Sequence, residues 1–156
     1  MREYVPPLVL FAITPSTVHT TIRAMVTVNI LGNKIGKEQL AKLQEMMKAH
    51  PTLVSLCGIA DDATEANLSG LGMDADDAVI LADELPAKGA LVKLDISSNY
   101  KNQEGKGYSY KSEEFIKPIA SMLKINTTIT ELNVSSNWLN AEAGGILSDA
   151  ISTNRA

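Results

Sequence analysis

The sequence of 156 residues has few of the residues that build disulfide-stapled, zinc-bound or membrane-spanning proteins. Its one cysteine, Cys57, excludes an intramolecular disulfide. Cys57 with His19 and His50, the two histidines, cannot supply the four ligands of an ordinary Cys and His zinc site. The longest apolar run near the start, residues 8–13, is far shorter than the roughly 20 residues that span a bilayer. We therefore expect a cytoplasmic protein with no membrane segment and no cofactor.

The charged residues show no basic excess. Lysine and arginine together number 14, against 18 aspartates and glutamates, and the net charge is −4. A general nucleic-acid binder needs a basic surface, so nucleic acid is not an expected partner. The hydrophobic share of 45% is enough for a folded core, and 156 residues is short for two domains.

What the sequence does contain is an internal repeat. Three segments share the order aliphatic, variable, aliphatic, two small or mixed residues, asparagine: VNILGN (28–33), LDISSN (94–99) and LNVSSN (132–137). Each is followed, directly or after an insertion, by apolar residues three and four apart, which is the spacing of one helical stripe. Alternation of a short strand with a helix predicts parallel strands packed under helices.

The helical segments align over residues 36–56, 74–94 and 112–132. Four apolar positions coincide in the three segments, and they are Leu40, Ala78 and Ile116; Leu43, Leu81 and Ile119; Met47, Leu85 and Leu123; and Leu53, Leu91 and Ile129. A fourth, incomplete copy begins at Asn137 and contains Leu139, Leu147 and Ile151.

The segments LVKLDISSN (91–99) and ITELNVSSN (129–137) match the pattern L-x-x-L-x-L-x-x-N/C. Over roughly residues 25–154 the chain resembles the leucine-rich repeat family, in its long ribonuclease-inhibitor type, and more loosely the protist members of that family. The resemblance implies a short right-handed α/β solenoid of about four repeats, with parallel strands on the concave side and helices on the convex side. Residues 25–156 would form this domain, and residues 1–24 an irregular N-terminal segment or cap.

Particular positions carry structural predictions. Asn99 and Asn137 end the clearest strands, where their side chains are expected to bind backbone groups of the adjacent repeat. The strand of the second repeat is either residues 56–58 or residues 66–68. The second choice is favoured because it restores a 28-residue spacing and keeps Gly58 out of the core. Residues 55–59 then form an extra strand-like segment.

Two insertions differ in chemistry. The acidic one, residues 61–77, is expected to place Asp74, Asp76 and Asp77 at a helix start, where carboxylates are favourable, rather than to bind calcium. The second, residues 100–111, carries three tyrosines with lysines and glycines. It suits a protein interface or a solvated loop whose tyrosines pack on their own repeat.

No catalytic group is expected. Cys57 lies in an apolar run, which is typical of a buried structural thiol. His50 aligns with Lys88 and Asn126 at a helix end that we expect to face solvent. The three arginines lie outside the clear strands, which disfavours an arginine-finger mechanism.

We expect a non-enzymatic protein–protein interaction module that binds an unknown protein partner on its concave strand face. A regulator of an enzyme, of the GTPase-activating or ribonuclease-inhibitor kind, and a structural fragment of a longer repeat array remain alternatives. For the uncapped C-terminal edge we expect either self-association through residues 131–154 or a native chain that continues further. The candidate contact residues are Asn29, Asn67, Lys93, Asp95, Ser97, Glu131, Asn133, Ser135, Trp138, Tyr100, Tyr108 and Tyr110, and Leu31 and Ser69 share the outward strand positions.

Overall fold

The computed structural model describes residues 25–99 and 111–154. Its elements, in order, are α2 (Lys37–Ala49), β1 (Glu65–Asn67), α3 (Ala75–Glu84), the 3-10 turn η1 (Leu85–Ala87), β2 (Lys93–Asp95), α4 (Ser112–Leu123), β3 (Glu131–Asn133) and α5 (Ala141–Thr153). The fold is mixed α/β, as the sequence predicts. The predicted N-terminal cap and the three tyrosines Tyr100, Tyr108 and Tyr110 lie outside the described residues.

The three strands form one parallel sheet in the order β1-β2-β3. Ala66 of β1 pairs with Leu94 of β2, and Leu94 pairs with Leu132 of β3. This register confirms the favoured strand of the second repeat, because Ala66 occupies the place of Leu94. Gly58, which the rejected alternative would have buried, is exposed and has a φ of 76°.

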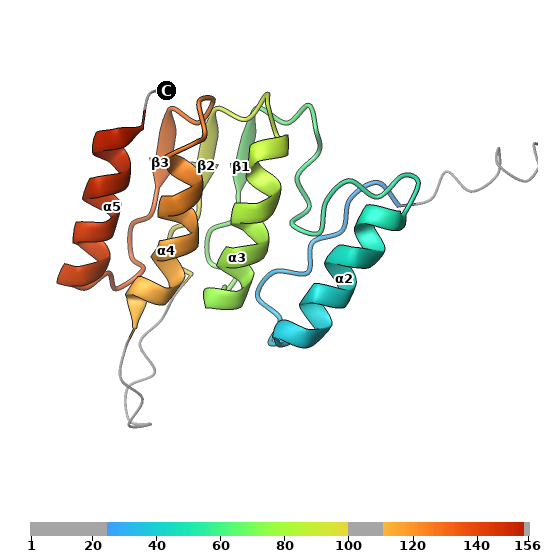
Figure 1. Ribbon diagram of the computed structural model, residues 1–156, viewed down its shortest axis with the longest axis horizontal. Helices are drawn as coiled ribbons and strands as arrows, with labels where there is room; N and C mark the ends of the chain where they lie inside the picture. The colour runs from blue at the N-terminus through green and yellow to red at the C-terminus, as the bar shows by residue number, and fades with distance from the viewer. Residues whose placement is uncertain (1–24, 100–110, 155–156) are drawn as a thin grey trace, which may run out of the picture.

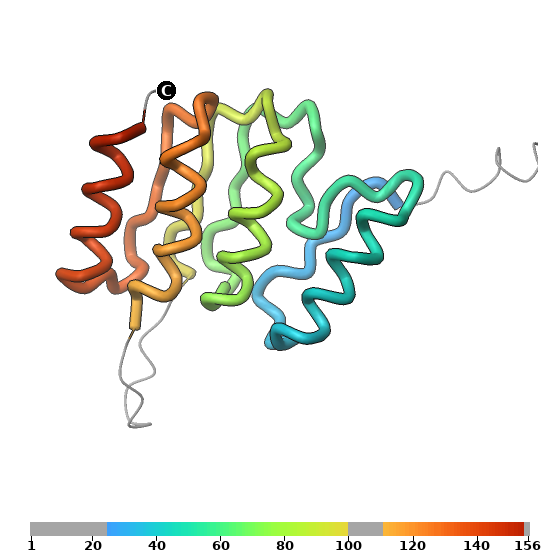
Figure 2. The backbone as a smooth tube through the Cα atoms, in the orientation of Figure 1, coloured from blue at the N-terminus to red at the C-terminus, as the bar shows by residue number. Residues whose placement is uncertain are grey.

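Helices α3, α4 and α5 lie side by side on one side of the sheet, and the opposite side of the sheet carries no helix of the described residues (Figure 1). The predicted helical stripe is confirmed in α3 and α4, where Leu81 and Ile119 are fully buried. Helix α2 is tilted away from this row (Figure 2). Its stripe residues Leu43 and Met47 are only half-buried, although Leu40 is buried.

The first repeat segment, residues 28–33, does not form a strand of the sheet. Thr27 and Asn29 make only isolated bridges, to Ser55 and Cys57 respectively. The segment around Ser55 therefore stands between the first unit and β1, as the predicted extra strand-like segment. Leu31, expected on the outward side, is instead buried.

Every unit turns in the same way after its strand position. The residue three places after the outward Asn or Asp has a positive φ, and these residues are Gly32 (78°), Gly70 (69°), Ser98 (57°) and Ser136 (57°). A left-handed residue costs little for glycine and more for serine. The same backbone turn therefore recurs even where its sequence varies.

Asn99 and Asn137 hold neighbouring units together, as predicted. The Asn99 amide donates to Leu68 O at 2.7 Å and to Ile96 O at 3.0 Å, so it joins two turns. Asn137 Oδ1 accepts from Asn99 N at 2.8 Å. Both asparagines are buried, and their side chains satisfy backbone groups that the turns remove from water.

The acidic residues before α3 act largely as predicted. Asp74 is the N-cap, and its side chain accepts from the backbone N–H groups of Asp76 and Asp77. The Asp77 side chain in turn accepts from Asp74 N, which completes a capping box. Asp77 is also buried, which its place in an acidic run did not indicate.

Candidate protein-binding face on the sheet

The helix-free side of the sheet presents two rows of polar side chains. Within each strand the middle residue faces the helices, and its two neighbours point outward. We call the six outward residues the sheet face, and they are Glu65, Asn67, Lys93, Asp95, Glu131 and Asn133. Since the strands are in register, residues predicted from separate repeats stand next to one another.

The first row alternates in charge across the sheet. Lys93 Nζ lies 3.2 Å from a carboxylate oxygen of Glu131 and 3.7 Å from one of Glu65. The hydrogen bond and charge of Glu131, followed by the charge of Glu65, raise the pKa of Lys93. All three side chains remain largely accessible, so these ion pairs order the row without adding much stability.

The second row combines amides with one carboxylate. Asn133 Nδ2 donates to Asp95 Oδ2 at 2.9 Å. The other oxygen of Asp95 accepts from Ser97 N at 2.8 Å. The hydrogen bonds from Ser97, and to a lesser degree from Asn133, lower the pKa of Asp95, which therefore stays ionised.

The outward Asn and Asp residues also shape the turns. The side-chain oxygens of Asn29, Asn67, Asp95 and Asn133 each accept from the backbone N–H two residues later, at 2.8–3.1 Å. This contact is the Asx turn, which steadies the chain as it leaves a strand. These candidate residues consequently have a structural role as well as an exposed position.

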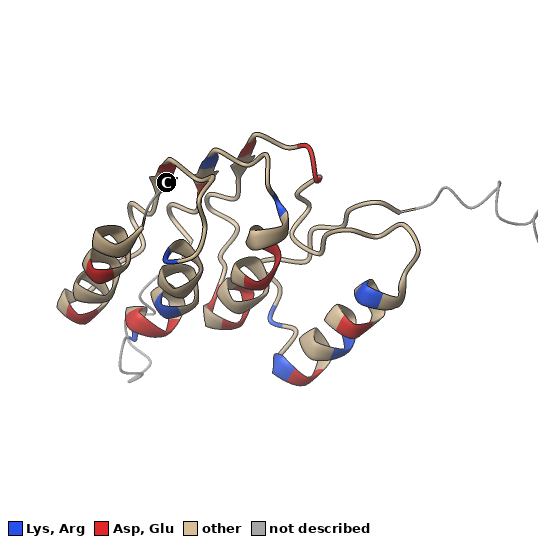
Figure 3. Ribbon diagram, turned by 45° about the horizontal axis from the view of Figure 1, so that its top comes forward, with Lys and Arg blue, Asp and Glu red and all other residues tan. Residues whose placement is uncertain are grey.

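The sheet face is hollowed into a groove of about 580 Å³. The outward residues line it together with Ala66, Leu94, Thr130 and Leu132. Its charged side chains are Glu65, Asp95 and Glu131 against Lys93, a net charge of −2. Figure 3 shows this pattern as red segments on the strands around the blue segment of β2.

The remaining candidates are placed unevenly. Trp138 is 58% exposed, which is consistent with an anchor at the rim, and Ser135 is exposed at the turn after β3. The prediction for Ser97 is wrong, because this residue is only 8% exposed and its carbonyl accepts from Gly70 N. Asn29 is exposed but lies outside the three-stranded sheet.

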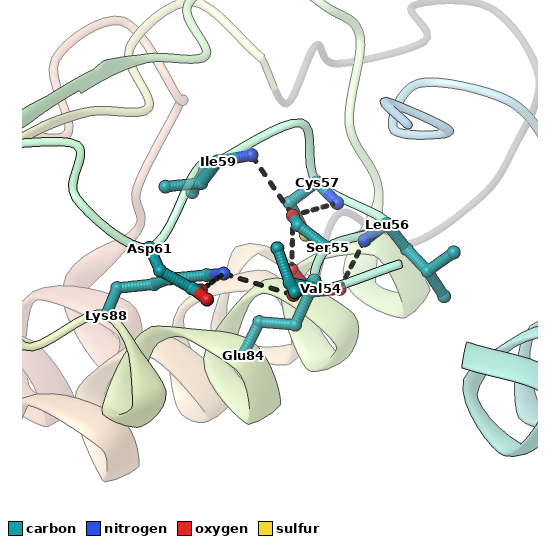
Figure 4. A network of polar contacts seen from close by, with 8 residues as sticks. All are labelled: Val54, Ser55, Leu56, Cys57, Ile59, Asp61, Glu84 and Lys88. Carbon is teal, nitrogen blue, oxygen red and sulfur yellow. Dashed lines mark hydrogen bonds and ion pairs between the residues drawn. The ribbon is translucent and has the colours of Figure 1, made fainter. Parts of the chain in front are cut away.

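A buried polar network beside the sheet was not predicted (Figure 4). Glu84 of α3 accepts from Ser55 Oγ and from Leu56 N, both at 2.7 Å. Ser55 Oγ accepts in turn from Cys57 N and Ile59 N, both at 3.0 Å. The network fixes the extra segment against α3. Ser55 is fully buried.

The prediction that Lys88, His50 and Asn126 face solvent is wrong, because Lys88 and Asn126 are buried and His50 is half-buried. Lys88 is 1% exposed, and its ammonium group donates to Val54 O at 3.1 Å and pairs with Asp61 at 2.7 Å. His50 Nδ1 and Asn126 Oδ1 each accept backbone N–H groups two and three residues later. His50 and Asn126 thus bind the turn into the next unit, whereas Lys88 contacts the segment 54–61 that precedes it in the chain.

Cys57 is a buried thiol, as predicted. Burial, followed by the negative charge of Glu84, raises its pKa well above the ordinary range. The protonated thiol is a poor nucleophile. Among the described residues, no group of three or more His, Cys, Asp or Glu side chains is arranged to hold a metal ion.

Comparisons with protein-family models, curated proteins and solved structures find no match to this chain. None of the helices in the described parts of the chain is long and apolar enough to cross a membrane.

Proposed function

We propose that this protein is a non-enzymatic binding module that holds a protein partner on the sheet face. We further propose that its fold is a short right-handed solenoid of the leucine-rich repeat type. Recurrence of the Asx turn, of the left-handed residue and of the linked asparagines supports the repeat. A cytoplasmic location fits a single buried and unpaired Cys57.

One observation carries the functional proposal: the sheet side that bears no described helix displays ordered, accessible, charged rows around a groove. Side chains that are already held in ion pairs lose little conformational entropy when a partner binds, which favours recognition. Trp138, which is exposed after the turn that follows β3, would supply a large apolar contact of the kind that dominates interface energies. The net charge of −2 on this face favours a partner surface with lysine or arginine side chains.

The test uses a partner captured by the intact chain and its affinity for a triple variant. Lys93→Glu with Glu131→Lys exchanges two charges of the first row and preserves an ion pair between β2 and β3, while Glu65 comes to face a carboxylate in place of the Lys93 ammonium. Tyr108→Ala removes one of the predicted tyrosine contacts. The triple variant should melt near the parent temperature, since the exposed pairs contribute only about 0–1 kcal/mol.

The expected result is an affinity at least roughly tenfold weaker, equal to about 1.4 kcal/mol. Val79→Lys, on the exposed side of α3, is the matched control and should bind the partner as the parent does. Unchanged affinity in the triple variant, or equal loss in the control, would contradict binding on the sheet face.

A further inference from the structure

The last unit, formed by β3 and α5, leaves partly exposed the apolar positions that are buried in the interior units. Leu94 of β2 and Ile119 of α4 are buried, whereas the equivalent residues Leu132 and Leu147 are only half-buried. Ile151 of α5 is 60% exposed. Among the described elements, none packs against this side of β3 and α5.

These residues line a groove of about 280 Å³ between β3 and α5, which we call the C-terminal groove. Its lining is predominantly apolar and consists of Leu123, Ile129, Thr130, Leu132, Val134, Leu147, Ile151 and Asn154. An apolar groove beside an unpaired strand edge combines two features that favour association with another chain.

The hydrogen bonds between β2 and β3 show which backbone groups the outer edge of β3 offers to another strand. Ile96 N donates to Asn133 O and Ser98 N donates to Ser135 O, both at 2.9 Å. The equivalent donors on the outer side of β3 are the N–H groups of Val134 and Ser136. No described strand lies beyond them, so β3 offers an incoming parallel strand the pattern that β2 offers to β3.

The opposite end of the molecule carries the complementary acceptors. Val28 N and Ile30 N donate to the segment around Ser55, so the alternating groups of this stretch point the other way. Those groups include the carbonyls of Asn29 and Leu31, which correspond to the acceptors Asn133 O and Ser135 O. Leu43 and Met47 of α2 are half-buried beside them, and Met46 is exposed.

The charges at the two ends are also complementary. Helix α2 carries Lys37, Lys42 and Lys48 against Glu38 and Glu45, a net charge of +1. Helix α5 carries only Glu142 and Asp149, a net charge of −2. Figure 3 shows blue segments on α2 and none on α5. A contact between α5 and α2 would therefore join helices of opposite net charge. Within the chain, the contact between α4 and α5 already contains one pairing of opposite charges, Lys117 with Glu142 at 3.8 Å.

We propose that the C-terminal groove and the edge of β3 bind the first unit, residues 25–49, of a second copy of this chain. In this contact Glu131, Leu132 and Asn133 pair with Thr27, Val28 and Asn29 of the second copy, in the register that joins β2 to β3. The two contacting surfaces differ, so each added copy leaves the same two ends free and the assembly grows head to tail. Glu131 and Asn133 take part in this contact through their backbone groups, and their side chains stay on the sheet face.

Sedimentation velocity over a range of concentrations tests the contact with paired variants. Ile151→Lys blocks the C-terminal groove with a charge of the same sign as α2. Thr27→Pro removes an outward N–H of the first unit without touching the bonds of Val26 or Val28 to the extra segment. Val26→Asp is a second block of that end, since Val26 is exposed and a carboxylate would face the acidic α5.

The parent should form larger species as concentration rises, and each blocked variant alone should lose them. Mixing Ile151→Lys with Thr27→Pro, or with Val26→Asp, should give dimers and nothing larger, because each mixture holds one intact groove and one intact first unit. Val79→Lys, on α3 away from both ends, should associate as the parent does. Circular dichroism and melting curves verify that each variant is folded.

Three outcomes would overturn the proposal. A parent that stays monomeric at all concentrations has no such contact. Folded first-unit variants that associate like the parent would mean that two C-terminal edges meet each other instead. Folded variants that are monomeric alone and still monomeric when mixed would exclude a head-to-tail contact.

Discussion

Residues 25–61 and residues 65–154 use the same turn chemistry but pack differently. Asn29 in the first region and Asn67 in the second each accept the backbone N–H two residues later. Only the second region, however, continues into paired strands of a sheet. Local residues are therefore sufficient for the turn, whereas strand pairing depends on what the chain places alongside.

The difference lies in what joins each unit to the next. In the second region, backbone ladders and the buried pair Asn99 and Asn137 connect the units. In the first region the extra segment intervenes, and Glu84 and Lys88 hold that segment by side-chain contacts. A polar network of a few side chains thus takes the place of a ladder of backbone hydrogen bonds. We therefore expect the first unit to be the less stable part of the molecule.

The largest expected effect concerns the apolar helix position that Leu43 occupies in the first region and Leu81 in the second. Leu81→Ala removes a fully buried side chain and should cost about 2–5 kcal/mol in the free energy of unfolding. Leu94→Ala should fall in the same range. Leu43→Ala, at the equivalent half-buried place in α2, should cost clearly less. Urea denaturation measures all three, and equal losses at Leu81 and Leu43 would remove the contrast between the regions.

The turn asparagines give the next largest difference. Asn99→Ala removes the side-chain donor to Leu68 O, at about 1–3 kcal/mol for the unsatisfied group, whereas Ile96 O keeps its bond from Asn137 Nδ2 at 2.8 Å. Asn33 makes a similar contact to Ile30 O but is exposed, so water can replace it. Asn33→Ala should cost less than about 1 kcal/mol. A loss of stability at Asn33 as large as that at Asn99 would show that the two turns contribute equally to the stability of the fold.

The polar network around Glu84 should affect the local stability of the first region alone. Glu84→Gln keeps only one acceptor oxygen, while Ser55 Oγ and Leu56 N both need one. Amide hydrogen exchange should accelerate at Leu56 and its neighbours, with a local loss of about 1–3 kcal/mol. Exchange at Ile96, in the ladder between β2 and β3, should stay as in the parent. Uniform acceleration across both regions would mean that they unfold together.

The smallest expected effect depends on pH. Burial raises the pKa of Asp77, against the opposing hydrogen bonds from Asp74 N and Gly32 N. A carboxyl whose pKa is raised on folding contributes stability below its ordinary value of about 3.9, and that contribution is lost as pH rises through the raised value. Asp77→Asn cannot ionise, so the variant should gain stability relative to the parent as pH rises from about 3 to 7.

Melting temperatures over this pH range measure the difference for Asp77. Asp83→Asn is the matched control, because it makes the same substitution at an exposed place on the same helix. A constant difference between Asp77→Asn and the parent at every pH would contradict an ionisation cost at this site.

Much of the architecture could be read from the sequence because it depends on spacing. The 28-residue interval placed Ala66 beside Leu94, and the repeated Asn predicted the link between Asn99 and Asn137. Burial of Lys88 could not be read in this way, since its partners Val54 and Asp61 lie 34 and 27 residues earlier. The site was predictable in part, because strand alternation gives the outward residues. Burial of Ser97 was not predictable in this way, because the equivalent Ser135, which precedes the same left-handed turn, is exposed.

Carboxylate footprinting of the chain, alone and with a partner that it captures, tests the central claim most directly. The account predicts that modification of Glu65 and Glu131 on the sheet face falls when the partner is bound. Glu38 and Glu114, which are exposed on α2 and α4, should be modified to the same extent in both states. Protection of Glu38 and Glu114 with Glu65 and Glu131 unchanged would place the partner on the helices and contradict binding at the sheet face.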